Sequence, residues 1–133
     1  MIRGLMVAGI IALTGCATPA GQIADVDFSW EQEVIAATPE EIQRRLLLGF
    51  RSCNVGVPEC FLAADRAALL CDVYVAAAGA RQSQFVMGRI RVESIADASS
   101  RVWAGLQPMY RRSWDKRIPS WLAFARGDAT CRD

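Results

Sequence analysis

Residues 85–108 read FVMGRIRVESIADASSRVWAGLQP, and apolar and polar side chains alternate through most of both halves. A period of two is typical of a β-strand that buries one of its faces. The small and polar residues at 97–100 are typical of a turn, and Pro108 ends the second half because proline cannot donate to a sheet ladder. The stretch therefore predicts two antiparallel strands, at 85–95 and 101–107. The side chains expected to face the core are Val86, Ile90, Val92, Val102, Ala104 and Leu106.

Two more strands are predicted upstream by the same alternation. Residues 68–76 form one of them, and residues 25–37 form the other. In the latter, Gln32 is the exception because it interrupts the apolar face. Residues 77–83 are small and polar and are expected to form a loop, whereas residues 59–68 fit no single pattern. The expected inward side chains are Leu69, Cys71, Val73 and Val75 in one strand and Val26, Phe28, Trp30, Val34 and Ala36 in the other.

Two helices are predicted, one after the first strand and one near the C-terminus. Thr38 is expected to cap the first helix, Pro39 to occupy its first position and Glu41 to complete a capping box. The second is expected to begin at Pro119 and to end at Gly127, since proline favours a helix start and glycine a helix end. The apolar stripes are Ile42, Leu46, Phe50 and Cys53, widened by Leu47 and Leu48, and then Ile118, Trp121, Leu122 and Ala125.

The order β-α-β-β-β-α predicts an α+β fold. A two-layer sandwich buries every apolar face: a four-stranded, mostly antiparallel sheet with both helices on one side. The last three strands are expected to form an antiparallel meander. The first strand is then expected at an edge and parallel to its neighbour, because a helical crossover joins parallel strands.

The first fifteen residues differ from the rest of the chain. Arg3 is their only charged residue, and an apolar run at 5–13 follows it. A basic start before an apolar run of about 7–15 residues is typical of a secretory signal peptide. The run ends in Leu-Thr-Gly-Cys at 13–16, which resembles the lipobox of bacterial lipoproteins. The resemblance implies cleavage before Cys16 and attachment of a diacylglyceryl group to its thiol, and Ala17 implies sorting to the outer membrane of a Gram-negative host.

The chain is therefore expected to comprise a signal peptide at 1–15, a lipidated tether at 16–25 and a single α+β domain at 26–133. The mature protein is expected to face the periplasm from the outer membrane. Because the nine residues at 17–25 reach at most about 30 Å when extended, the domain must act near the lipid surface.

Beyond the lipobox the chain has four cysteines. An even set in an exported protein is typical of two disulfides. In the predicted topology all four lie at the same end of the domain, and this convergence favours the pairs Cys53–Cys131 and Cys60–Cys71. A short strand at 60–64 would place Cys60 directly opposite Cys71. The two other connectivities stay open.

The composition argues against catalysis, metal binding and nucleic-acid binding. The 133 residues include no histidine, the commonest general base and metal ligand. No Cys-x-x-Cys pair is present, and the carboxylate pairs Glu31/Glu33 and Glu40/Glu41 lie on an expected solvent face and at a helix start. With 15 basic and 14 acidic residues, the chain lacks the basic excess of a nucleic-acid binder. We therefore expect no catalytic residue, no metal and no cofactor.

Two surfaces are candidates for contact with a partner. The sheet face that no helix covers is expected to gather aromatic and arginine side chains, which are enriched in interface hot spots. A basic cluster near the C-terminus, interleaved with Tyr110 and Trp114, suits anionic headgroups. The alternatives are a solvated face with cross-strand ion pairs and a polar helix start. The candidates are Tyr74, Arg89, Arg91, Arg101 and Trp103 for a protein partner, with Asp27, Glu31 and Glu33 on the same face, and Arg111, Arg112, Lys116 and Arg117 for the membrane surface.

The expected function is that of a lipid-anchored, periplasm-facing and non-catalytic accessory in envelope interaction or assembly. Its expected partners are the membrane, through the anchor, and an envelope protein. A periplasmic module that binds a ligand or inhibits an enzyme is the alternative, and an enzyme of unrecognised type is a third hypothesis. An exposed aromatic and arginine face favours the first, an open apolar groove between helices and sheet the second, and a deep pocket with perturbed acids the third.

Overall fold

The computed structural model describes residues 28–131, except 78–79 and 115. This part of the chain forms an α+β fold with one antiparallel sheet of five strands, in the order β1-β5-β4-β3-β2, and three helices. The strands are β1 (Ser29–Ile35), β2 (Val57–Leu62), β3 (Ala68–Ala77), β4 (Ala80–Ala96) and β5 (Ser99–Leu106), and the helices are α1 (Pro39–Ser52), α2 (Pro108–Trp114) and α3 (Arg117–Ala125).

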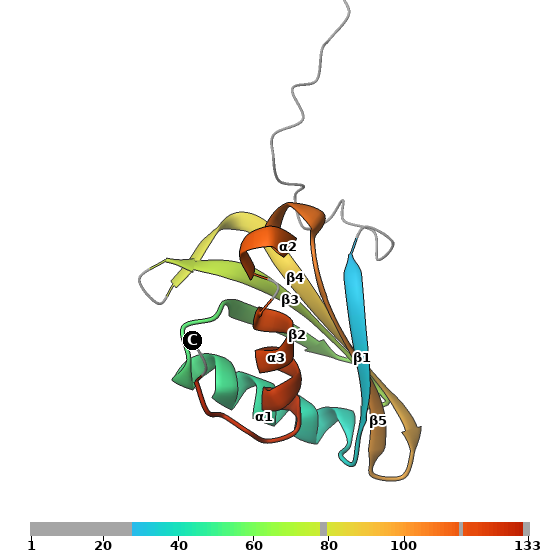
Figure 1. The fold of residues 1–133 in the computed structure, drawn as a ribbon. Helices are drawn as coiled ribbons and strands as arrows, with labels where there is room; N and C mark the ends of the chain where they lie inside the picture. Colours follow the sequence, from blue (N-terminus) through green and yellow to red (C-terminus); the bar gives the residue numbers. More distant parts are fainter. Residues whose placement is uncertain (1–27, 78–79, 115, 132–133) are drawn as a thin grey trace, which may run out of the picture.

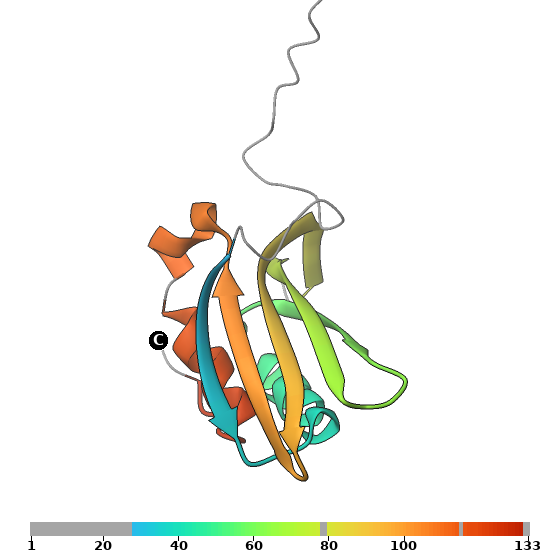
Figure 2. The same ribbon diagram turned by 90° about the vertical axis from the view of Figure 1, so that its right-hand side faces the viewer.

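The helices α1 and α3 lie side by side on one face of the sheet (Figure 1). The main core fills the space between them and the sheet, and Ile42, Leu46, Trp121 and Phe124 from the two helices are fully buried in it. The opposite sheet face stands in front of both helices in Figure 2, and none of the three described helices covers it. We call this second surface the open face.

The sheet has one strand more than the sequence pattern predicts. The extra strand, β2, comes from the stretch that fits no single pattern, and it forms a hairpin with β3. Its presence reverses the direction of each strand that follows. The first strand, β1, therefore pairs antiparallel with β5 at the sheet edge, and the predicted parallel neighbour is wrong. The α1 connection instead carries the chain from one edge of the sheet to the other.

The buried face of β1 is the opposite of the one predicted. Ile35 points into the main core, whereas Trp30 and Val34 lie on the open face, where Val34 is 54% exposed. Acidic residues alternate with them on the helix side, and they are tolerated there because β1 is an edge strand. Glu33 accepts a hydrogen bond from Arg126, just after α3, at 2.6 Å. Of the residues predicted inward, Val26 lies outside the described part and Ala36 is exposed.

A bulge in β4 places Val86 on the sheet face opposite to the one predicted. Val73 pairs with Gly88 and Tyr74 with Val86, so Met87 is an extra residue in the ladder. Met87 packs in the main core, and Val86 turns to the open face. The other five side chains predicted inward from 85–108 are buried in the main core as expected. The predicted loop at 77–83 is also shorter than expected, because β3 continues to Ala77 and β4 begins at Ala80.

The start of α1 follows the predicted signals. Pro39 is its first residue, and Thr38 Oγ1 accepts a hydrogen bond from the Glu41 amide at 3.2 Å. The predicted capping box is only half formed, because the Glu41 carboxylate contacts Arg44 and Arg45 further along the helix instead of the Thr38 amide. Leu47 and Leu48 were expected to widen the buried stripe, but they face solvent, since the core already meets the helix along Ile42, Leu46, Phe50 and Cys53.

The C-terminal segment forms two short helices where one was predicted. Pro108 begins α2, and Pro119 lies in the first turn of α3 rather than at its start. Gly127 ends α3 in a left-handed conformation, with φ of +94°. Its amide donates to the Phe124 carbonyl, and the Asp128 amide donates to the Ala123 carbonyl, which is a Schellman arrangement.

Two disulfides join the four cysteines in the pairing expected from the sequence. Cys53–Cys131, with an S–S distance of 2.02 Å, ties the end of α1 to the segment after α3. Cys60–Cys71, at 2.04 Å, crosses directly between β2 and β3. The described helices are all too short or too polar to cross a membrane.

Candidate docking surface

The open face is built from aligned rows of side chains, because the registers of all five strands bring them directly opposite one another. One row runs from Gln32 in β1 through Trp103 in β5 and Arg91 in β4 to Leu70 and Phe61. The row is rich in large side chains, and Phe61 at its far end is 60% exposed.

Trp30 lies next to this row because β5 has a glycine at the paired position. Trp30 pairs with Gly105, and a Cβ at Gly105 would approach Trp30 Cε3 to 2.8 Å. The indole therefore covers the β5 backbone. The centre of the Phe28 ring lies 5.3 Å from the centre of the Trp30 ring, and Phe28 extends the same aromatic cover.

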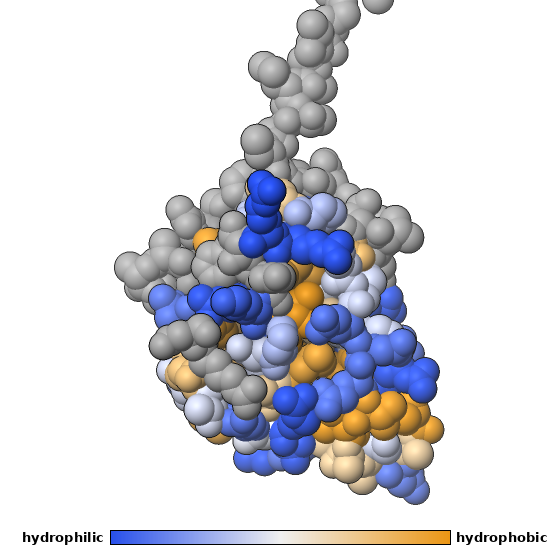
Figure 3. Space-filling model, in the orientation of Figure 1, coloured by the Kyte–Doolittle hydropathy of each residue, from blue (hydrophilic) through white to orange (hydrophobic). Residues whose placement is uncertain are grey.

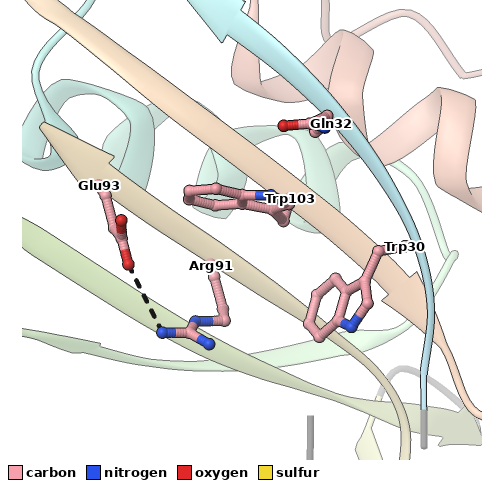
Figure 4. A pocket seen from close by; sticks show the side chains of 5 residues that line it. All are labelled: Trp30, Gln32, Arg91, Glu93 and Trp103. Atoms are coloured by element: carbon pink, nitrogen blue, oxygen red, sulfur yellow. Dashed lines mark ion pairs between the residues drawn. The ribbon is translucent and has the colours of Figure 1, made fainter. Parts of the chain in front are cut away.

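The two indoles border an open hollow of about 420 Å³, lined by Trp30, Gln32, Arg91, Glu93 and Trp103 (Figure 4). We call it the Trp30–Trp103 groove. Arg91 Nη2 and Glu93 Oε1 are 3.5 Å apart in it, and the side chains remain 41% and 50% exposed. The guanidinium of Arg101 lies 6.0 Å from the centre of the Trp103 ring, at the margin of the groove. The lining thus offers two apolar ring surfaces beside hydrogen-bond donors and acceptors.

Two of the residues predicted to bind a partner are not accessible. Arg89 is buried and donates to Asp72 at 2.7 Å, and its guanidinium lies 5.1 Å from the centre of the Phe28 ring. Tyr74 is buried in the small cluster that Phe28 forms with Val86. These side chains support the open face from within, so the accessible candidates are Arg91, Arg101 and Trp103.

Sequence reasoning missed part of the groove and misplaced two acids. The alternation of β1 predicts a buried Trp30 and treats Gln32 as an exception, whereas both line the groove. Gln32 was in fact the usable signal, because a polar residue in an apolar alternation indicates that its face is open. Glu31 and Glu33, expected on the open face, lie on the helix side of β1. Asp27 lies outside the described residues.

The basic cluster lies at one end of the sheet. Arg111 and Arg112 are exposed on α2, Lys116 is exposed just before α3, and Arg117 is half-buried at its start. Tyr110 packs against the main core, and this burial raises the pKa of its phenol above the ordinary value. Of the flanking aromatic residues, Trp114 has a side chain outside the described part.

The remaining chemistry on the described surface is structural. Hydrogen bonding to Arg44 lowers the pKa of the Glu41 carboxyl and raises that of Arg44, at the exposed start of α1. Within residues 28–131, leaving aside the three undescribed positions, no group of histidine, cysteine and acidic side chains is arranged to hold a metal ion. Cys16, the predicted lipid site, precedes the described residues.

Compared with known protein families, with curated proteins and with solved structures, the chain shows no significant similarity to any of them.

Proposed function

We propose that this protein is a lipid-anchored, periplasm-facing accessory of the bacterial envelope that binds a partner protein through its open face and carries out no catalysis. The observation that carries the proposal is the Trp30–Trp103 groove on the sheet face that the described helices leave uncovered. Tryptophan and arginine are the side chains most enriched where truncation weakens protein binding. Here both types line one hollow.

The surroundings of the groove favour a protein over a small solute. Exposed apolar side chains extend the surface on both sides, with Val34 on β1 and Phe61 on β2. Together with the two indoles they make an aromatic and apolar surface larger than single scattered side chains, which is typical of an interaction site. The two charged side chains in the groove form an ion pair, and none of the lining residues is a nucleophile held by a base.

The anchor follows from the lipobox-like motif at residues 13–16. Intact mass measurement of the protein from membranes should show a chain that begins at Cys16 with added acyl mass. Cys16→Ser should leave the protein outside the outer-membrane fraction. An unmodified chain that begins at Met1 would remove the anchor from the proposal.

Site-specific crosslinking tests the open face. A photoreactive residue at Gln32, inside the groove, should capture one defined envelope protein in intact cells, and Trp103→Ala should abolish that capture. The matched control is the same photoreactive residue at Leu48, which is 56% exposed on α1. Equal capture from Leu48, or capture unaffected by Trp103→Ala, would count against docking at the groove.

A ligand-binding module is the second candidate, since the groove volume of about 420 Å³ falls within the range of small-ligand sites. Tryptophan fluorescence that responds to a small envelope solute, with loss of the response in Trp103→Ala and no protein capture from Gln32, would favour it.

A further inference from the structure

We propose that α2 rests on the anionic phospholipid headgroups of the leaflet that holds the Cys16 anchor, so that the domain has a fixed orientation on the membrane. The inference depends on the proposed lipid anchor and adds a second membrane contact to it. One acyl-modified residue keeps the domain at the membrane, but it does not set the orientation of the domain. A second membrane contact at a defined place on the domain sets that orientation.

The first step is that α2 lies at the end of the sheet from which the chain leads back to Cys16. Ser29, the first residue of β1, pairs with Leu106, the last residue of β5, and α2 begins two residues later. Figure 1 shows α2 and the start of β1 at the same end of the molecule.

The second step is the reach of the chain. Thirteen residue steps separate Cys16 from Ser29, and they extend to roughly 45 Å at most. The far end of the sheet is more distant by the length of β5, whose eight residues span about 27 Å. Of the two ends of the domain, the α2 end therefore has the higher effective concentration at the membrane.

The third step is the chemistry of α2. Tyr110 is partly buried and packs against the core, and successive residues of a helix are about 100° apart. Arg112 therefore lies opposite to Tyr110, and Met109 and Arg111 lie on either side. All three are exposed, Met109 to 44%, and hydrophilic side chains gather over α2 in Figure 3. An exposed methionine beside two arginines suits the boundary of headgroups and acyl chains.

The orientation has a consequence for the open face. The strands run from the α2 end to the opposite end, so docking by α2 directs them away from the membrane. The Trp30–Trp103 groove is then presented sideways into the periplasm and stays accessible to a protein partner.

Hydrogen exchange on the lipidated full mature chain tests the proposal. The protein is reconstituted in nanodiscs of phosphatidylcholine alone or with phosphatidylglycerol. Exchange of the α2 amides should be slower in the anionic discs, and added salt should reduce the difference. Arg111→Gln with Arg112→Gln should lower the docking equilibrium roughly thirtyfold and remove the protection.

The matched control is Arg44→Gln with Arg66→Gln, which removes two exposed arginines from the opposite end of the molecule, one on α1 and one in the turn between β2 and β3. This variant should keep the protection of α2. Equal exchange in both disc types, or protection that survives in the Arg111/Arg112 variant, overturns the proposal while the anchor stands. A chain without acyl mass overturns both.

Discussion

At the residue scale, Gly105 shapes the groove through the space it leaves. Its backbone is not left-handed, so the glycine is required by contact rather than by conformation. An added Cβ would lie 2.8 Å from Trp30 Cε3 and 3.1 Å from Phe28 Cβ. Because the side chain of Gly105 is a single hydrogen atom, the side chains of Trp30 and Phe28 can lie over β5.

We expect Gly105→Ala to lower the free energy of unfolding by about 1–3 kcal/mol and to displace Trp30, because a close-packed contact cannot absorb a methyl group. Chemical denaturation and tryptophan fluorescence measure the two effects. In a Trp30→Ala background the loss should be smaller, since neighbouring substitutions are not additive. An identical loss in both backgrounds would show that Trp30 is not the obstacle.

The buried ion pair Arg89–Asp72 is expected to contribute more to the free energy of unfolding than the half-exposed groove pair Arg91–Glu93. Side-chain exposure is 8% for Arg89 and 16% for Asp72, so removal of the carboxylate leaves a charge in a poorly hydrated place. We expect Asp72→Ala to lower the free energy of unfolding by about 3 kcal/mol. Glu93→Ala, at the half-exposed pair, is the control and should cost less than about 1 kcal/mol. Similar losses for both would mean that burial does not separate the two pairs.

At the element scale, the strands show what periodicity reports and what it omits. Alternation located β3, β4 and β5, but it assigned the wrong face to β1 and to Val86. In β4 the cause is local: the extra residue Met87 shifts the alternation by one position. In β1 the cause is distant, because the aromatic residues pack on Gly105 and Arg89 of other strands.

Tyr110 packs the short helix α2 against the core. The partial burial of the Tyr110 phenol makes the stability of the fold sensitive to alkaline pH. The folded-state pKa of Tyr110 is raised, so the folded chain keeps a phenol proton that the unfolded chain releases. This contribution is complete below the ordinary tyrosine pKa and is lost as pH rises through the folded pKa.

We therefore expect the free energy of unfolding to fall at alkaline pH, and to fall less steeply in Tyr110→Phe, which has no phenol proton to release at that position. Denaturation across pH measures this, and ultraviolet absorbance follows phenol ionisation. The chain has two tyrosines, so the ionisation step that is missing in Tyr110→Phe belongs to Tyr110. A normal titration of the residue in the folded protein would contradict the role of burial.

At the scale of the whole molecule, the two disulfides differ in how far apart in the sequence their cysteines lie. Cys53–Cys131 closes a separation of 78 residues and ties α1 to the C-terminal segment. Cys60–Cys71 closes a separation of 11 residues within one hairpin. In the loop-entropy account, the longer closure restricts the unfolded chain more.

We expect Cys53→Ser with Cys131→Ser to lower the free energy of unfolding by about 4 kcal/mol, and Cys60→Ser with Cys71→Ser by about 3 kcal/mol. Denaturation of the two double variants measures the order, and peptide mass spectrometry without reductant should identify both links. Four free thiols in the purified mature protein would contradict the framework.

Local sequence patterns located β3, β4 and β5, the start of α1 and the end of α3, and they favoured the cysteine pairs that form. The Thr38 cap, the Gly127 helix end and the alternation of β5 depend on neighbours within a few residues, and local patterns report such interactions well. Only the tertiary structure decided that β1 lies antiparallel beside β5, that Trp30 faces outward and that Arg89 is buried. These outcomes depend on contacts between distant segments. Trp30 and Trp103 meet at one groove because the sheet register brings their strands together, and no pattern within either strand carries that information.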